Sequence, residues 1–180
     1  MLMSHVSREM VLYCFDVLLG YLNGEDEKKC PFVGPVGGLF VTWNSSKELR
    51  GCIGCLSNIC LSELGKYAIR SSQADSRFKP IGLSDVDNRL TCTVSLLHTF
   101  ELCADKTDWT VGNHGIVAEF TCGDGRMRTA TFLPDVMTEQ KWNHSDALIA
   151  AARKCGASKH THVKVTRYQS SKMTLSYAEI

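Results

Sequence analysis

The 180-residue chain is 44% hydrophobic, and at roughly 150 residues per domain we expect one self-sufficient domain over residues 1–180. Twenty basic and nineteen acidic side chains leave a formal net charge of +1. This balance excludes a strong positive field over the whole chain, so neither nucleic acid nor an anionic membrane surface is an expected partner.

The cysteine content indicates an intracellular protein. Nine cysteines are about 5% of the chain, below the roughly 8–10% of a disulfide scaffold, and their number is odd. Reduced thiols in the cytoplasm or nucleus are therefore expected. The apolar run VLYCFDVLLGYL near the N-terminus is interrupted by Asp16 and follows a segment without net basic character. We expect neither a signal peptide nor a membrane span from it.

The first half of the chain begins with a helix and continues into a hairpin. Apolar spacing of three and four residues predicts a helix capped by Ser4 and ending near Leu22, and Asn58 is expected to cap a second helix. In chain order, the expected elements are a helix over 4–22, a loop over 23–38, paired strands over 38–43 and 48–54, a helix over 58–74 and a long strand over 89–103.

The second half repeats the mixture of hairpins and helices. Gly123-Asp124-Gly125 predicts a hairpin turn, and Gly156 is placed to end a helix. The expected elements are strands over 115–122 and 126–133, helices over 133–142 and 145–155, and final strands over 162–168 and 173–179 joined by a turn. Hairpins with helices between them indicate an α+β fold, mainly antiparallel sheet with helices packed on it.

The stretch KELRGCIGCL contains a C-x-x-C pair, Cys52 and Cys55. A structural zinc site needs four ligands, and no second pair follows at a suitable spacing; Cys155 with His160 and His162 makes only a loose cluster. A redox dithiol usually lies where a strand gives way to a helix, whereas the expected helix starts several residues after Cys55. We therefore expect no metal site and no cofactor.

Cys52 by itself allows two interpretations. Period-two alternation would direct Leu49 and Ile53 toward the core and would place Arg50 and Cys52 together on the other face. A guanidinium within roughly 7 Å favours a thiolate, so Cys52 is a candidate nucleophile. The alternative is a small cysteine that only fills space in the sheet.

The two flanking glycines carry the same ambiguity. Gly51 and Gly54 would leave room for a ligand to approach the backbone, which makes them candidate ligand-binding positions. They could equally serve a β-bulge or tight sheet packing. Residue types alone leave both interpretations open.

Several motifs in a fixed order resemble one protein family. They are LRGCIG at 49–54, DSRFKP at 75–80, VSLL at 94–97, Trp109 with Gly112, HGI at 114–116, LPDV at 133–136, Trp142, Lys154 with Gly156, and TRY at 166–168. The chain resembles the AMMECR domain family over nearly its whole length. The resemblance implies an intracellular α+β domain with a larger and a smaller lobe around a cleft beside the LRGCIG strand.

The resemblance does not imply a reaction. Related prokaryotic domains accompany Memo-like and radical S-adenosylmethionine proteins, which suggests partners by association only. Cys55 and Cys155 stand where family members usually carry small residues, so the C-x-x-C spacing is interpreted as accidental. Cys52 matches the motif itself.

Three further residues are candidate partners of Cys52. His114, in a glycine turn, could act as a base near the thiol or could hydrogen-bond the backbone. Asp75 and Arg77 could bind a ligand, or could form an ion pair that holds the loop before Pro80.

The leading hypothesis is a cleft centred on Arg50 and Cys52 that binds a small molecule, with Cys52 as nucleophile. Asp75, Arg77 and His114 would border it. The alternative is a binding or scaffold module that grips a protein partner with the same cleft, because no complete catalytic set is evident. Nucleic-acid binding would rest only on scattered basic residues.

Overall fold

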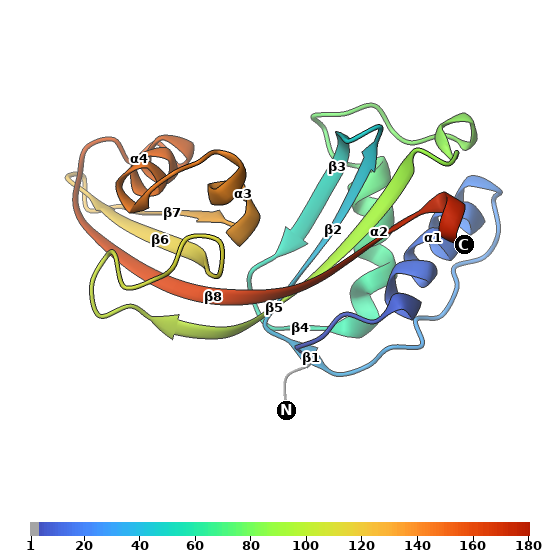
Figure 1. The fold of residues 1–180 in the computed structure, drawn as a ribbon, viewed down its shortest axis with the longest axis horizontal. Helices are drawn as coiled ribbons and strands as arrows, with labels where there is room; N and C mark the ends of the chain where they lie inside the picture. Colours follow the sequence, from blue (N-terminus) through green and yellow to red (C-terminus); the bar gives the residue numbers. More distant parts are fainter. Residues whose placement is uncertain (1–3) are drawn as a thin grey trace. The chain divides into compact units, whose positions relative to one another are not determined.

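The computed structural model describes residues 4–180, which form two compact units (Figure 1). Unit 1 consists of the described residues up to His98 together with Ser171–Ile180, and unit 2 is Thr99–Ser170. Strands β5 (Leu90–Leu102) and β8 (His160–Ser176) contribute residues to both units. The expected α+β class and the presence of a larger and a smaller lobe are confirmed.

Figure 1 shows runs of strands separated by helices along the chain. The helices are α1 (Arg8–Leu22), α2 (Leu64–Gln73), α3 (Pro134–Glu139) and α4 (His144–Lys154). The other strands are β1 (Pro35–Val36), β2 (Gly38–Ser45), β3 (Glu48–Cys55), β4 (Ile59–Cys60), β6 (Gly115–Cys122) and β7 (Met127–Phe132). None of the helices in residues 4–180 has the length and apolar character that crossing a bilayer requires.

Unit 1 packs two helices on a sheet with the strand order β3-β2-β5-β8, and β1 pairs separately with β4. The Trp43 side chain is fully buried and meets Phe15 of α1 edge-on, with ring centroids 5.1 Å apart. Its indole N–H donates to the Ala68 carbonyl and to the Ser71 hydroxyl, both at 3.1 Å. These bonds satisfy the buried indole and hold α2 against β2.

Unit 2 packs α3 and α4 against a sheet with the strand order β8-β6-β7. Three alanines of α4, Ala147, Ala151 and Ala152, are buried against this sheet, so the helix approaches it closely. Gly115 lies under the ring of its cross-strand partner Tyr168, where an added Cβ would come within 2.3 Å of the ring.

Three element boundaries differ from the sequence-based expectations. Helix α1 begins at Arg8 with Ser7 as N-cap, because the Ser4 hydroxyl bonds instead to the neighbouring His5 ring. Asn58 does not cap the second helix, since β4 and a 3-10 turn at Leu61–Glu63 come first. The turn expected at 169–172 is wrong: β8 is one continuous strand, which pairs with β6 in unit 2 and extends into the sheet of unit 1.

Helix α4 begins with a capping box. The Asn143 side chain accepts from the Asp146 N–H at 3.0 Å, and the Asp146 carboxylate accepts from the Asn143 N–H at 3.2 Å. We expect Asn143→Ala to lower the free energy of unfolding by about 1 kcal/mol, because a helix donor loses its acceptor. Urea unfolding measures this change. Asn143→Asp keeps the acceptor and should stay near wild type, whereas equal losses in both variants would contradict the capping role.

Candidate functional site

The register of the β2–β3 hairpin decides what faces Cys52. The strands are joined by Ser46–Lys47, whose φ angles of 52° and 70° suit a tight hairpin turn. Regular pairing from this turn would place Val41 opposite Cys52. A β-bulge at Arg50 shifts the register by one residue, so Cys52 is paired with Thr42 instead.

The sulfur of Cys52 is held by a hydroxyl from the neighbouring strand. The Thr42 hydroxyl donates to Cys52 Sγ with 3.1 Å between the two atoms, and the Cys52 residue is half-buried. A donor aimed at sulfur stabilises a thiolate relative to a thiol, because the anion is the stronger acceptor. The arrangement is therefore compatible with a nucleophilic sulfur.

The alternation expected over residues 49–54 holds from Gly51 to Gly54 and fails at Leu49, and the bulge is the reason. Gly51 is paired with Trp43, whose side chain lies in the core, whereas Leu49 is paired with Asn44 on the opposite face. Leu49 is half-buried and does not anchor the strand in the core as expected. Arg50 is the extra residue in β3.

The two glycines of the motif serve close packing. A Cβ on Gly51 would lie 1.7 Å from the Ser71 carbonyl oxygen of α2, so only glycine allows this helix to approach β3. A Cβ on Gly54 would lie 2.2 Å from the Phe40 ring. The space expected beside these two glycines for a ligand is thus filled by the protein, as the packing interpretation predicted.

Asp75 and Arg77 bracket the outer edge of β3 at Cys52. Asp75 Oδ2 accepts from the Cys52 N–H at 2.9 Å, and Arg77 Nη2 donates to the Cys52 carbonyl at 3.2 Å. The two side chains also form an ion pair, with 2.7 Å between Arg77 Nη2 and Asp75 Oδ2. They replace a neighbouring strand at this point and fix the backbone that carries the thiol.

The electrostatic surroundings of Asp75 and Arg77 favour the charged forms of both side chains. The Arg77 guanidinium and the Cys52 N–H hold the pKa of the Asp75 carboxyl well below its usual range, and Asp75 raises the pKa of Arg77 in turn. The Asp75 side chain is only 7% exposed, whereas the Arg77 side chain is 58% exposed, so the carboxylate is shielded and the guanidinium is partly screened by solvent. The interpretation of Asp75 and Arg77 as an ion pair is confirmed.

Arg50 forms a second ion pair, with Asp85. Arg50 Nη1 lies 3.3 Å from Asp85 Oδ1, and both side chains are half-buried. The Gly82 N–H, and then the Arg50 guanidinium, lower the pKa of Asp85. With Arg50 and Arg77 each paired to a carboxylate, the groups around Cys52 carry no large net charge.

His114 belongs to unit 2, whereas Cys52 belongs to unit 1. The Thr110 N–H donates to His114 Nδ1 at 3.0 Å, so the neutral ring carries its proton on Nε2. This is the local backbone role that the sequence allowed for a histidine in a glycine turn. A joint site of His114 and Cys52 stays a prediction.

Other thiols provide a comparison for Cys52. Ser57 lowers the pKa of the half-buried Cys55, and Ser62 lowers the pKa of the exposed Cys60. No disulfide joins any of the nine cysteines. Within residues 4–180, no group of three or more His, Cys, Asp or Glu side chains is placed to hold a metal ion.

Sequence reasoning missed two partners of the site. Thr42 faces Cys52 only because of the bulge, and a bulge leaves no clear signal in one sequence beyond the glycine beside it. Asp85 is distant in sequence from its partner Arg50. The segment over 83–89 contains two aspartates, and nothing in their spacing selects this one.

Comparisons with known proteins place the chain in a family. A model of the AMMECR1 family matches residues 11–173. An uncharacterized protein of Arabidopsis thaliana is 36% identical over 190 residues, covering 98% of this chain and 88% of that protein. An uncharacterized protein of Schizosaccharomyces pombe is 31% identical, covering 96% and 94%.

A solved structure shares the fold. The crystal structure of an uncharacterized protein from Pyrococcus horikoshii has a TM-score of 0.77 and 26% sequence identity, and the match covers 92% of this chain and 89% of that chain. The family match over most of the chain and the level of identity to full-length relatives confirm the resemblance first seen in the LRGCIG stretch. The chain belongs to the AMMECR1 family.

Proposed function

We propose that unit 1 binds a small uncharged electrophile at the Cys52 edge of β3 and that Cys52 acts as the nucleophile. The observation that carries the proposal is the half-buried Cys52 sulfur, which accepts a hydroxyl bond from Thr42 while Asp75 and Arg77 hold the peptide groups on either side. The ion pair fixes the backbone that carries the thiol, as the positioning of a reactive group requires.

The proposed step is substitution at an electrophilic carbon. The thiol proton leaves to water, the sulfur lone pair forms the new sulfur–carbon bond, and the leaving group departs with the former bonding pair. Arg50 and Arg77 are neutralised by Asp85 and Asp75, so the site offers little attraction to a charged substrate. Arg77 and Asp75 are positioning residues in this proposal.

A protein-binding module using the same surface is the alternative. Strand addition is a common way for a sheet edge to bind a peptide. At Cys52, however, the outward N–H and carbonyl already bond to Asp75 and Arg77, so an added strand would first have to break both bonds. This favours the small-molecule function, and Memo-like and radical S-adenosylmethionine partners stay predictions.

Site-resolved alkylation tests the role of Cys52. We expect iodoacetamide to modify wild-type Cys52 at neutral pH and Thr42→Val to slow this reaction about tenfold, because the thiolate loses a donor worth about 1.4 kcal/mol. Thr42→Ser keeps the hydroxyl and should react at the wild-type rate. Mass spectrometry of the modified peptides measures each rate.

Cys60 provides the internal reference, because its exposed thiol lies outside the hairpin. If Cys60 were labelled and Cys52 were not, the Cys52 sulfur would only be packed. The same conclusion would follow if Thr42→Val left the rate of Cys52 modification unchanged. If iodoacetate modified Cys52 faster than iodoacetamide does, with each rate taken relative to Cys60, the proposal of an uncharged substrate would be contradicted.

A further inference from the structure

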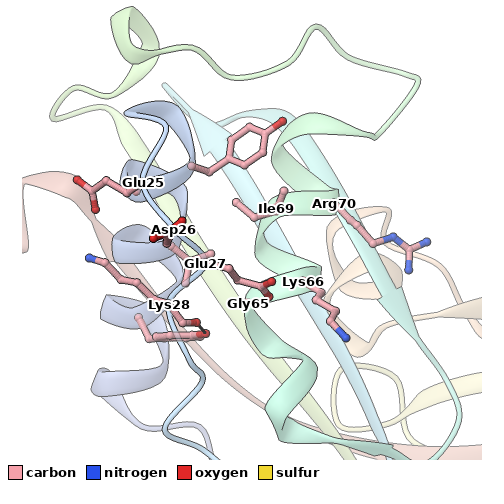
Figure 2. Close-up of a pocket in the computed structure, with 12 residues that line it drawn as sticks. Glu25, Asp26, Glu27, Lys28, Gly65, Lys66, Ile69 and Arg70 are labelled. Carbon is pink, nitrogen blue, oxygen red and sulfur yellow. Dashed lines mark hydrogen bonds between the residues drawn. The ribbon is translucent and has the colours of Figure 1, made fainter.

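A hollow of unit 1 lies between α1, the loop over residues 24–28 and α2 (Figure 2). Its volume is about 410 Å³, within the range of sites for small molecules. Tyr13, Val17, Tyr21 and Ile69 provide apolar and aromatic walls. None of these residues takes part in the Cys52 site.

The hollow is built by contacts that do not depend on a ligand. Gly65 of α2 faces the Tyr13 hydroxyl, which would lie 2.7 Å from an added Cβ, so glycine makes space for this ring. The Tyr13 hydroxyl donates to the Lys28 carbonyl at 3.0 Å and ties the loop to α1. Burial raises the pKa of Tyr13. A neutral tyrosine therefore holds the loop across the working pH range.

The loop side of the hollow carries three consecutive carboxylates. Glu25, Asp26 and Glu27 are exposed, line the hollow, and form no ion pair with any residue in 4–180. Figure 2 shows Glu27 on the side of the loop that faces α2. Lys28 of the same loop also lines the hollow, so the loop adds three carboxylates and one ammonium group, a net negative charge, to an aromatic hollow.

The two basic residues that α2 contributes to the rim are engaged elsewhere. Lys66 Nζ pairs with the carboxylate of Glu63 at 2.9 Å, and the Arg70 guanidinium lies 5.5 Å from the centre of the Tyr67 ring. Figure 2 shows the Lys66 and Arg70 side chains extending away from α1. Neither forms an ion pair with the loop, although Glu27 attracts Lys66, so the loop keeps its excess of negative charge.

We propose that this hollow binds a small organic cation, an ammonium group attached to an apolar body. The apolar body would occupy the space between Tyr13, Val17 and Ile69, and the ammonium group would lie between the tyrosine rings and the loop carboxylates. Aromatic faces and carboxylates both attract ammonium groups, and their combined effect is larger away from bulk water. This inference is independent of the function proposed for Cys52.

Three probes of similar size and different charge test the proposal. Isothermal titration calorimetry with the full chain would compare 2-phenylethylammonium, 2-phenylethanol and 3-phenylpropionate. We expect the cation to bind at least about tenfold more tightly than the alcohol, and the carboxylate to bind least. Chemical shifts of Val17 and Ile69 methyl groups would locate the bound cation in the hollow.

Two variants separate the charge of the loop from the hollow itself. The triple variant E25Q/D26N/E27Q should reduce binding of the cation to the level of the alcohol. A control variant, E48Q/E139Q, removes exposed carboxylates outside the hollow and should bind like wild type. Ile69→Trp fills the hollow and should abolish binding of the cation and of the alcohol.

Several outcomes would overturn the proposal. They are equal binding of cation and alcohol, tighter binding of the carboxylate, a cation preference that survives in the triple variant, or no binding of the cation at millimolar concentration. Binding that Ile69→Trp leaves unchanged would place the cation elsewhere on the protein. Because no readout involves Cys52, failure here would leave the proposed nucleophile untouched.

Discussion

Replacing Gly51 with alanine should destabilise the protein by about 3 kcal/mol, the upper range for overpacking a tight interior contact. The added methyl group would lie 1.7 Å from the Ser71 carbonyl oxygen, which belongs to helix backbone and has little freedom to move. Either α2 or β3 must shift, and α2 is already held by the bonds between Trp43 and the helix. Urea unfolding followed by circular dichroism measures the loss.

Gly123→Ala is the matched control for this prediction. An added Cβ at Gly123 meets nothing within 4 Å, so we expect a change within about 0.5 kcal/mol. If Gly51→Ala were as mild as Gly123→Ala, α2 would not pack on β3 as closely as the structure shows. The packing role of the motif glycine would then be wrong.

Replacing Asp75 with asparagine should lower the free energy of unfolding at neutral pH by about 2 kcal/mol, because the charged hydrogen bonds to Arg77 are lost. Asparagine keeps one oxygen for the Cys52 N–H. The folded pKa of Asp75 lies below its unfolded value, so its contribution is complete above about pH 4 and is lost as the pH falls further. The difference between wild type and variant should therefore shrink in acid.

The chain contains a matched control for this ion pair. Asp87 and Arg89 repeat the Asp-x-Arg spacing and form an ion pair in solvent. Asp87→Asn should have a much smaller effect than Asp75→Asn, because solvent screens the exposed pair. Two results would show that the Asp75–Arg77 ion pair contributes little to the free energy of unfolding. One is an equal effect of the two variants. The other is a stability difference for Asp75→Asn that does not change between pH 7 and pH 2.

The LRGCIG motif has a packing role in the hairpin beside the chemical role proposed for Cys52. Neighbouring residues fill the space beside Gly51 and Gly54, and Asp75 and Arg77 hold the edge of β3. The proposed chemistry rests on the Cys52 sulfur with its hydroxyl donor. One motif therefore combines residues that shape the hairpin with a residue that the hairpin presents.

Local patterns predicted most elements because the forces that produce them act over a few residues. Apolar residues at helical spacing predicted α1, and the predicted core stripe is buried at Met10, Tyr13 and Val17, whereas Tyr21 at its end is exposed. The hairpin between β2 and β3 and the long strand β5 followed from turn residues and alternation. The failure at 169–172 has the opposite cause, since a polar segment stays extended where neighbouring strands pair with it.

The sequence by itself determined the α+β class, the family and the identity of the motif residues, because composition, spacing and ordered motifs are local properties. Only the tertiary structure decided the register that places Thr42 beside Cys52, the contact of Gly51 with α2, and the Asp75–Arg77 bracket. Each of these depends on one inserted residue or on segments distant in the chain. Such contacts form when elements pack against each other, so no local sequence pattern predicts them.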